Sequence, residues 1–352
     1  RRRHTRLRTV TGIQTCALPI SDGHLRHPVY LGLRDDKRAA DVRREDAPAT
    51  HVRSRHGESL PAKPERAHSP EAVISQLRDL EEFEKNTRPI HEEILKRAKN
   101  DLAVERLEPW DLEFWLQSQQ TSNGDEIWSV ETSVERMLSL MRSIGFNPDS
   151  LPIDVEIKDN PYTGFAFPVR PPYEARFLTL PVPGADFYQT LFHEYGHSLQ
   201  SVSIDKNLPL AFLSLDEGPM SEAVGELIGY FAYDASWLIR TIGISPEEAL
   251  RLERVSKLQF FVWLRRTCMQ AYFEVKAYNN LDGDLNALYA QTYQRFLGLE
   301  LPKGYFYSGL AIAGTAPMYN VSYLYGNMIA AQLREAVQEQ LGVDDQIGRA
   351  HV

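Results

Sequence analysis

Residues 192–199 carry the most information about this chain, and they read Phe192-His193-Glu194-Tyr195-Gly196-His197-Ser198-Leu199. On a helix, residues four apart lie on the same face, so His193 and His197 can both bind one Zn²⁺ ion. Glu194 lies beside them, where it can accept the proton of a metal-bound water. Apolar side chains recur every fourth residue from Phe187 to Leu199, which predicts that the opposite helix face packs against a core.

A catalytic zinc site needs a third protein ligand and one open position. The only His after His197 is His351, so we expect the third ligand to be a carboxylate. The run that follows offers four candidates, namely Asp216, Glu217, Glu222 and Glu226. We assign Glu222, 25 residues after His197, as the ligand. Glu226 lies one helical turn later, where a carboxylate can hold a ligand imidazole in place.

The remaining sequence predicts a mainly α-helical domain with one small, irregular β-sheet. Periodicity and capping signals predict helices over about 70–102, 109–115, 133–145, 186–199, 219–242, 246–278, 284–298 and 319–341. The proline-rich stretch 146–185 contains three strand-like runs, at 155–157, 165–169 and 176–180. Gly225 and Gly229 lower helix stability, which indicates that the zinc-binding helix approaches them closely.

The composition limits the class of protein. The chain has 352 residues, 43% of them hydrophobic and 25% charged, with a formal net charge of −9. This is the composition of a globular protein with a large core, and it excludes disorder over the whole length. Two Cys cannot form a disulfide scaffold, and no run of 18 apolar residues predicts a membrane span. Because the charge is acidic, we expect no nucleic-acid partner. We also expect no membrane partner and a cytoplasmic location.

The two ends of the chain differ from its body. Residues 1–66 carry 15 Lys and Arg against 8 Asp and Glu, whereas residues 67–346 carry 23 against 40. Residues 347–352 can be encoded by a DNA string whose reverse complement lies inside one DNA string that encodes residues 14–20. The shared string resembles a library adapter. We therefore expect 1–21 and 347–352 to derive from an adapter. Residues 22–66 are expected to be an out-of-frame or disordered lead, with a genuine basic tail as the alternative.

Residues 67–346 then form one expected domain, which we predict to be truncated at its N-terminus. Cys268 is its one cysteine, and it lies in a long amphipathic run. We predict that this thiol belongs to the core rather than to a reactive site.

The motif and its surroundings resemble the thimet oligopeptidase and oligoendopeptidase F family of zinc peptidases. Residues 192–199 look like the zinc-binding helix of that family. A second stretch is similar to the third-ligand helix of a relative, angiotensin-converting enzyme, and reads Ser221-Glu222-Ala223-Val224-Gly225-Glu226. The resemblance implies that Glu222 binds zinc and that Glu226 supports a ligand His. It covers about residues 105–340 and implies a mostly helical fold with a deep channel that admits short peptides.

The resemblance also implies roles for tyrosines near the C-terminus. The segment Ser322-Tyr323-Leu324 is similar to a Tyr segment of the family, which implies that Tyr323 donates a hydrogen bond to the oxyanion of the tetrahedral intermediate. The second Tyr of that pattern is here Asn320, and the nearest phenol is Tyr319, a candidate for either a catalytic or a structural role. The family also has a His upstream, but residues 303–318 contain none. Tyr305 and Tyr307 are candidates to replace it or to pack the loop.

The strand-like run 176–180 precedes the zinc-binding helix. The resemblance implies that this strand lines the cleft, where an extended peptide can pair with its edge. A purely structural strand is the alternative.

The leading hypothesis is a metallopeptidase that hydrolyses peptide bonds in short peptides. It holds one Zn²⁺ ion with His193, His197 and Glu222, and Glu194 is the general base. Two alternatives remain open. One is a zinc carboxypeptidase or peptidyl-dipeptidase of the same clan. The other is a catalytically impaired relative that binds peptides without cleaving them, which the missing His suggests.

Overall fold

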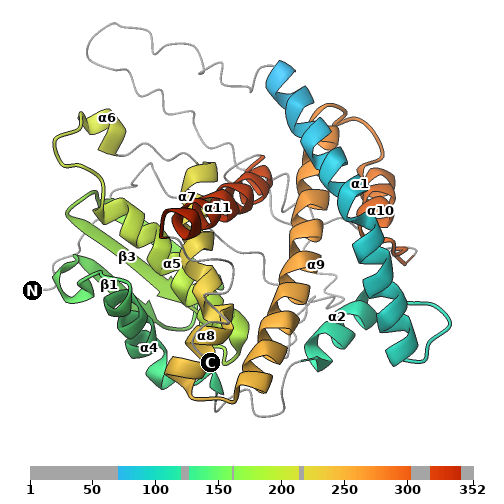
Figure 1. The fold of residues 1–352 in the computed structure, drawn as a ribbon. Helices are drawn as coiled ribbons and strands as arrows, with labels where there is room; N and C mark the ends of the chain where they lie inside the picture. The colour runs from blue at the N-terminus through green and yellow to red at the C-terminus, as the bar shows by residue number, and fades with distance from the viewer. Residues whose placement is uncertain (1–69, 120–126, 161, 214–217, 303–317, 342–352) are drawn as a thin grey trace, which may run out of the picture.

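The computed structural model describes residues 70–119, 127–160, 162–213, 218–302 and 318–341, and helices make up most of them (Figure 1). The α-helices are α1 (Pro70–Asp101), α2 (Pro109–Ser118), α4 (Val130–Ser143), α5 (Ala185–Val202), α6 (Leu210–Leu213), α7 (Gly218–Gly229), α8 (Ala235–Trp237), α9 (Pro246–Tyr278), α10 (Leu285–Leu297) and α11 (Asn320–Leu341). The predicted mainly α-helical fold class is therefore confirmed. Each described helix is too short or too polar to cross a membrane. The predicted adapter-derived and lead segments, 1–66 and 347–352, lie outside the described residues.

Several helix ends follow the capping signals in the sequence. The hydroxyl of Ser245 accepts a hydrogen bond from the backbone N–H of Glu248 over 3.3 Å, and Pro246 occupies the first position of α9. Gly145 follows α4 and Gly298 follows α10, with φ angles of 97° and 66° that favour glycine. The predicted start of the helix over 246–278 and the predicted ends at Gly145 and Gly298 agree with the structure.

Three strands form one small sheet beside α5, namely β1 (Ile153–Ile157), β2 (Gly164–Arg170) and β3 (Glu174–Thr179) (Figure 1). Their order is β1-β3-β2, with β1 parallel and β2 antiparallel to β3. The three predicted strand-like runs are thus confirmed. The expectation that a peptide pairs with the 176–180 run is wrong, because β3 is the central strand and both its edges are paired. Among the described residues, β2 is an edge strand that also contacts α5.

The helix predicted over 219–242 is interrupted. α7 stops at Gly229, and a 3₁₀ turn, η3 (Tyr230–Tyr233), follows it. Asp234 then adopts an extended conformation, and its carboxylate accepts hydrogen bonds from the backbone N–H groups of Ser236 (2.9 Å) and Trp237 (3.1 Å). These bonds start α8, and a π-helical turn, η4 (Leu238–Ile242), completes the run. Such local side chain–backbone bonds compete with helix continuation, and apolar periodicity does not reveal them.

Two clusters of buried apolar side chains stabilise the fold. One joins the sheet, α4, α5 and α8, and includes Phe177 and Trp237. The other joins α1, α2, α9 and α10, and includes Trp115, Phe296 and the fully buried Cys268, as predicted for a core thiol. α7 and α11 pack against each other between these two groups of helices (Figure 1). The motif-bearing helix α5 is therefore fixed by the first cluster on one side and by α7 on another.

Candidate metal centre

Three buried donor atoms meet between α5 and α7. The Nε2 atoms of His193 and His197 lie 2.9 Å apart, and Oε2 of Glu222 lies 3.4 Å and 4.0 Å from them. Donors bound to one tetrahedral zinc ion at about 2.0–2.1 Å would be ~3.3 Å apart. All three side chains are at most 3% exposed. Within the described ranges, they form the one group of three or more His, Cys, Asp or Glu side chains that could hold a metal ion.

Glycines allow the two helices that carry these donors to approach. A Cβ atom at Gly225 of α7 would lie 2.8 Å from Cε1 of His193 and 3.0 Å from Cε1 of His197. A Cβ atom at Gly196 of α5 would lie 2.8 Å from a backbone oxygen of α7. A Cβ atom at Gly229 of α7 would lie 3.3 Å from the Cβ atom of His193. The predicted close approach of the motif-bearing helix to Gly225 and Gly229 is therefore confirmed.

Each imidazole has a polar partner on the side opposite its Nε2 atom. Oγ of Ser221 lies 2.9 Å from Nδ1 of His197, which is hydrogen-bond distance. Oε1 of Glu226 lies 3.7 Å from Nδ1 of His193, an ion-pair distance. A partner such as Ser221 at Nδ1 favours the tautomer of His197 that leaves Nε2 as a metal donor, whereas Glu226 lies beyond hydrogen-bond distance of His193 and acts on it through its charge. The structure places Glu226 beside the imidazole as expected, whereas Ser221 was not predicted, although its position directly before Glu222 is a usable signal.

Glu194 lies in a buried environment next to the sheet. Its side chain is fully buried, and neither carboxylate oxygen has a hydrogen-bond partner among the described residues. A Cβ atom at Gly164, the first residue of β2, would lie 2.8 Å from Oε1 of Glu194. Glycine therefore makes room for this carboxylate at the start of an edge strand. A buried carboxylate without partners is costly, which indicates that it is kept for a ligand or for chemistry. Sequence reasoning missed Gly164, because no motif precedes it.

Burial of three carboxylates around two imidazoles shifts their pKa values. Burial raises the pKa of Glu194 to about 8 and that of Glu226 to about 7, with Glu222 adding to both shifts and His193 opposing them. Burial acts to lower the pKa of His193, but the hydrogen bond with Glu222 and the nearby carboxylates raise it to about 9. Burial and the charge of His193 lower the pKa of His197 to about 3. A divalent cation would neutralise this crowded negative charge, so the donor set fits a metal ion.

The two tyrosines singled out from the sequence have different surroundings. The hydroxyl of Tyr319 donates a hydrogen bond to Oε1 of Glu222 over 2.6 Å. Tyr323 is 2% exposed, and its ring makes edge-to-face contacts with those of Tyr319 and Trp263, at centroid distances of 5.7 Å and 5.6 Å. Tyr319 therefore contacts the third donor residue directly, whereas Tyr323 is its neighbour in the same aromatic cluster.

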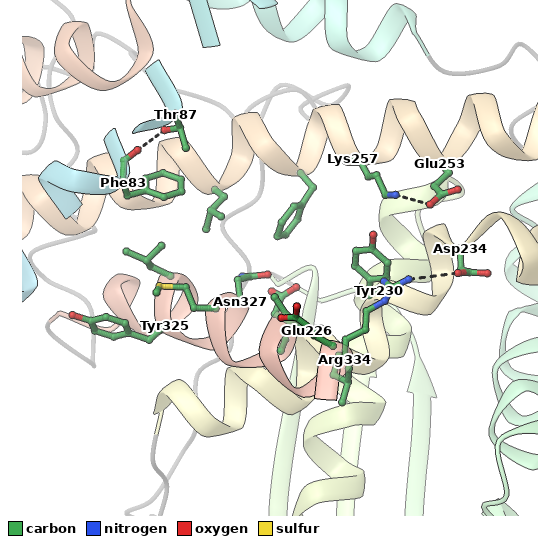
Figure 2. A pocket seen from close by; sticks show the side chains of 18 of the residues that line it. Phe83, Thr87, Glu226, Tyr230, Asp234, Glu253, Lys257, Tyr325, Asn327 and Arg334 are labelled. Atoms are coloured by element: carbon green, nitrogen blue, oxygen red, sulfur yellow. Dashed lines mark hydrogen bonds and ion pairs between the residues drawn. The ribbon is translucent and has the colours of Figure 1, made fainter. Parts of the chain in front are cut away.

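A cavity of about 1660 Å³ lies beside this centre, bordered by α1, α9, α11 and η3. Glu226 lines its middle, and Tyr230 and Arg334 lie toward one end (Figure 2). The guanidinium of Arg334 lies 4.0 Å from the ring centroid of Tyr230 and 3.9 Å from the carboxylate of Asp234. Because Glu226 faces both the cavity and His193, the cavity adjoins the metal centre through this side chain.

Some candidates from the sequence lie outside the described residues. Asp216 and Glu217 fall in 214–217, and Tyr305 and Tyr307 fall in 303–317. The segment that lacks the expected His is also outside them, except for Met318.

The chain is similar to solved structures in fold, but its sequence matches no protein family. No protein-family model matches the chain, and no curated protein matches it. The solved structure described as PZ peptidase A with inhibitor 2 matches with a TM-score of 0.55 and 14% identity, over 78% of this chain and 50% of that one. A structure assigned as an oligoendopeptidase F has a TM-score of 0.49 and 14% identity, over 77% of this chain and 49% of that one. The chain thus spans about half the length of the structures it matches, and it shares the helical fold of the first.

Proposed function

We propose that this chain is a zinc-dependent peptidase that hydrolyses short peptides. One observation carries the proposal: the donor atoms of His193, His197 and Glu222 converge, and the residue beside His193 in the sequence is Glu194, a buried carboxylate with no hydrogen-bond partner in the described chain. The fold shared with PZ peptidase A supports the same conclusion. These side chains are almost fully buried, and the neighbouring cavity adjoins them at Glu226, which favours short peptides over folded proteins as substrates.

In this proposal, His193, His197 and Glu222 would hold one zinc ion. Zinc bound there would polarise the scissile carbonyl and lower the pKa of a water molecule. Glu194 accepts the proton of the attacking water and then delivers it to the leaving amine. Tyr323 donates a hydrogen bond to the developing oxyanion.

We propose β2, rather than the central strand β3, as the strand with which an extended peptide pairs. The sheet order gives β2 one edge without a partner strand among the described residues. Its first residue, Gly164, adjoins Glu194, so a peptide along this edge would pass the general base. Backbone hydrogen bonds to a strand edge bind peptides with little regard to sequence.

The two alternatives differ from this proposal in defined ways. A carboxypeptidase or peptidyl-dipeptidase of the same clan would use the same residues but require a free peptide terminus. A catalytically impaired relative would bind zinc and peptides without cleaving them. The position of Glu194 beside the donor set favours hydrolysis over binding alone.

The proposal is tested by the zinc content of the purified protein and by cleavage of matched peptides with free or blocked ends. We expect one zinc ion per chain and cleavage of blocked peptides that stops with a chelator and returns with zinc. Cleavage of free-ended peptides alone would assign an exopeptidase. A zinc-loaded protein that cleaves no peptide in the panel would refute the proposal in favour of a binding protein.

A further inference from the structure

The two oxygens of the Glu222 carboxylate face different partners. Oε2 is the atom near the Nε2 atoms of His193 and His197, at 3.4 Å and 4.0 Å. Oε1 accepts the hydrogen bond from the hydroxyl of Tyr319 over 2.6 Å. A short, charge-assisted hydrogen bond to one oxygen fixes the rotation of a carboxylate. The other oxygen of Glu222 is then held toward the position that a metal ion would take.

Tyr319 is itself held from helix α9. It directly precedes α11, between Met318 and Asn320. Glu274 of α9 is 2% exposed, and interactions with the backbone of Met318 and the side chain of Asn320 oppose the rise in its pKa that burial causes. Met318 has a φ of 67°, a conformation that residues other than glycine rarely adopt unless their surroundings hold it. Glu274 therefore interacts with the residues on both sides of Tyr319.

Close packing leaves this arrangement little freedom. A Cβ atom at Gly326 of α11 would lie 2.5 Å from Cβ of Glu222, so the two helices touch at the third donor residue. A Cβ atom at Gly218 of α7 would lie 3.4 Å from Cε2 of Tyr319. A change in the position of Tyr319 should therefore move the Glu222 side chain, because the helices are packed too closely to compensate.

We propose that Tyr319 is a positioning residue for Glu222, and that Glu274 fixes Tyr319 in turn. This relay connects α9 to the third metal ligand. The hydrogen bond from Tyr319 orients the Glu222 carboxylate, as the contact with Ser221 orients the imidazole of His197. The inference rests on the proposed function only in requiring that Glu222 binds a metal ion, and it assigns Tyr319 to metal binding rather than to the oxyanion.

The test compares zinc affinities, measured by competition with a chelator, and visible spectra of the cobalt-substituted protein. Tyr319→Phe removes the hydroxyl and should weaken zinc binding by about 10-fold to 100-fold and alter the cobalt spectrum. Tyr325→Phe is the matched control on the same helix, since the hydroxyl of Tyr325 donates over an equal 2.6 Å to Asp79. The control should leave both readouts unchanged, because Asp79 is not a donor of the metal centre.

Glu274→Gln tests the second step of the relay. The amide keeps the size of the side chain but loses the charge, so zinc binding should weaken in the same direction. In the double variant, Glu274→Gln should lower the zinc affinity of Tyr319→Phe by less than it lowers that of the parent, because both changes act on one relay. Unchanged zinc affinity and cobalt spectrum in Tyr319→Phe would overturn the relay while the proposed function stands. Full additivity would overturn the role of Glu274, and a parent protein that binds no zinc would overturn both proposals.

Discussion

Gly225 of α7 lies directly against the imidazole of His193. A Cβ atom at position 225 would come within 2.8 Å of Cε1 and 3.0 Å of Nδ1 of that ring. Real Cβ atoms do not approach other atoms closer than 3.0 Å, and here the obstacle is a ring held between two buried helices. The convergence of the donor atoms therefore depends on the absence of a side chain at this position.

Gly225→Ala should weaken zinc binding by at least about tenfold, because the new methyl group displaces the His193 ring. Alanine would by itself favour the helix by ~0.5–1 kcal/mol, so lower helix propensity cannot explain the loss. Gly229→Ala is the milder change on the same helix, since its Cβ atom would lie 3.1 Å from the side-chain end of Gln189 and 3.3 Å from Cβ of His193, so zinc binding should weaken less. Chelator competition measures both variants, and equal weakening in the two would contradict the argument.

Ser221→Ala should also weaken zinc binding, by about tenfold, because Nδ1 of His197 loses its partner at 2.9 Å. Ser201→Ala is a suitable control, because Ser201 lies one turn after His197 on α5 and its buried hydroxyl has no partner among the described residues. Zinc affinity of Ser201→Ala should equal that of the parent. A Ser221→Ala variant with parental affinity would mean that packing alone orients His197.

Acid should destabilise the fold through His91. This side chain is 2% exposed, and its Nε2–H donates to the backbone oxygen of Leu297 over 3.0 Å. Burial lowers the pKa of His91 to about 4 from 6.5, so the unfolded chain binds the proton first as the pH falls. The contribution is present above pH 6.5 and is lost toward pH 4, which amounts to about 2 kcal/mol between pH 8 and pH 5.

His91→Gln isolates this effect, because glutamine can still donate to Leu297 but does not titrate. Urea unfolding of the metal-free proteins at pH 8 and pH 5 gives the comparison. The parent should lose about 2 kcal/mol more than the variant between the two pH values. Equal losses would show that His91 does not titrate with a lowered pKa.

The donor set could be predicted because helical geometry and metal chemistry act over short distances in the sequence. Positions 193 and 197 share a helix face whatever the rest of the chain does. Glu222 required a further argument: no His lies between His197 and the C-terminal tail, so the expected third ligand after the motif is a carboxylate. The structure then brings all three donors together.

Other parts of the site depend on contacts that no local pattern encodes. Tyr319 and Glu222 are 97 residues apart, and their hydrogen bond depends on how α11 crosses α7. The order β1-β3-β2 places β2, rather than the expected strand β3, at an edge of the sheet. The alternation of residues along a strand does not reveal which strands lie beside it. The cap formed by Asp234 starts a new helix inside a run that apolar periodicity predicts as one helix to Ile242.

Glu194→Gln tests the central claim most directly, because the amide has the shape of the carboxylate but cannot accept the proton of the attacking water. The account predicts that this variant binds one zinc ion per chain like the parent and cleaves blocked peptides about 10²-fold to 10⁴-fold more slowly. Turnover at the parental rate with zinc bound would contradict the assignment of Glu194 as the general base.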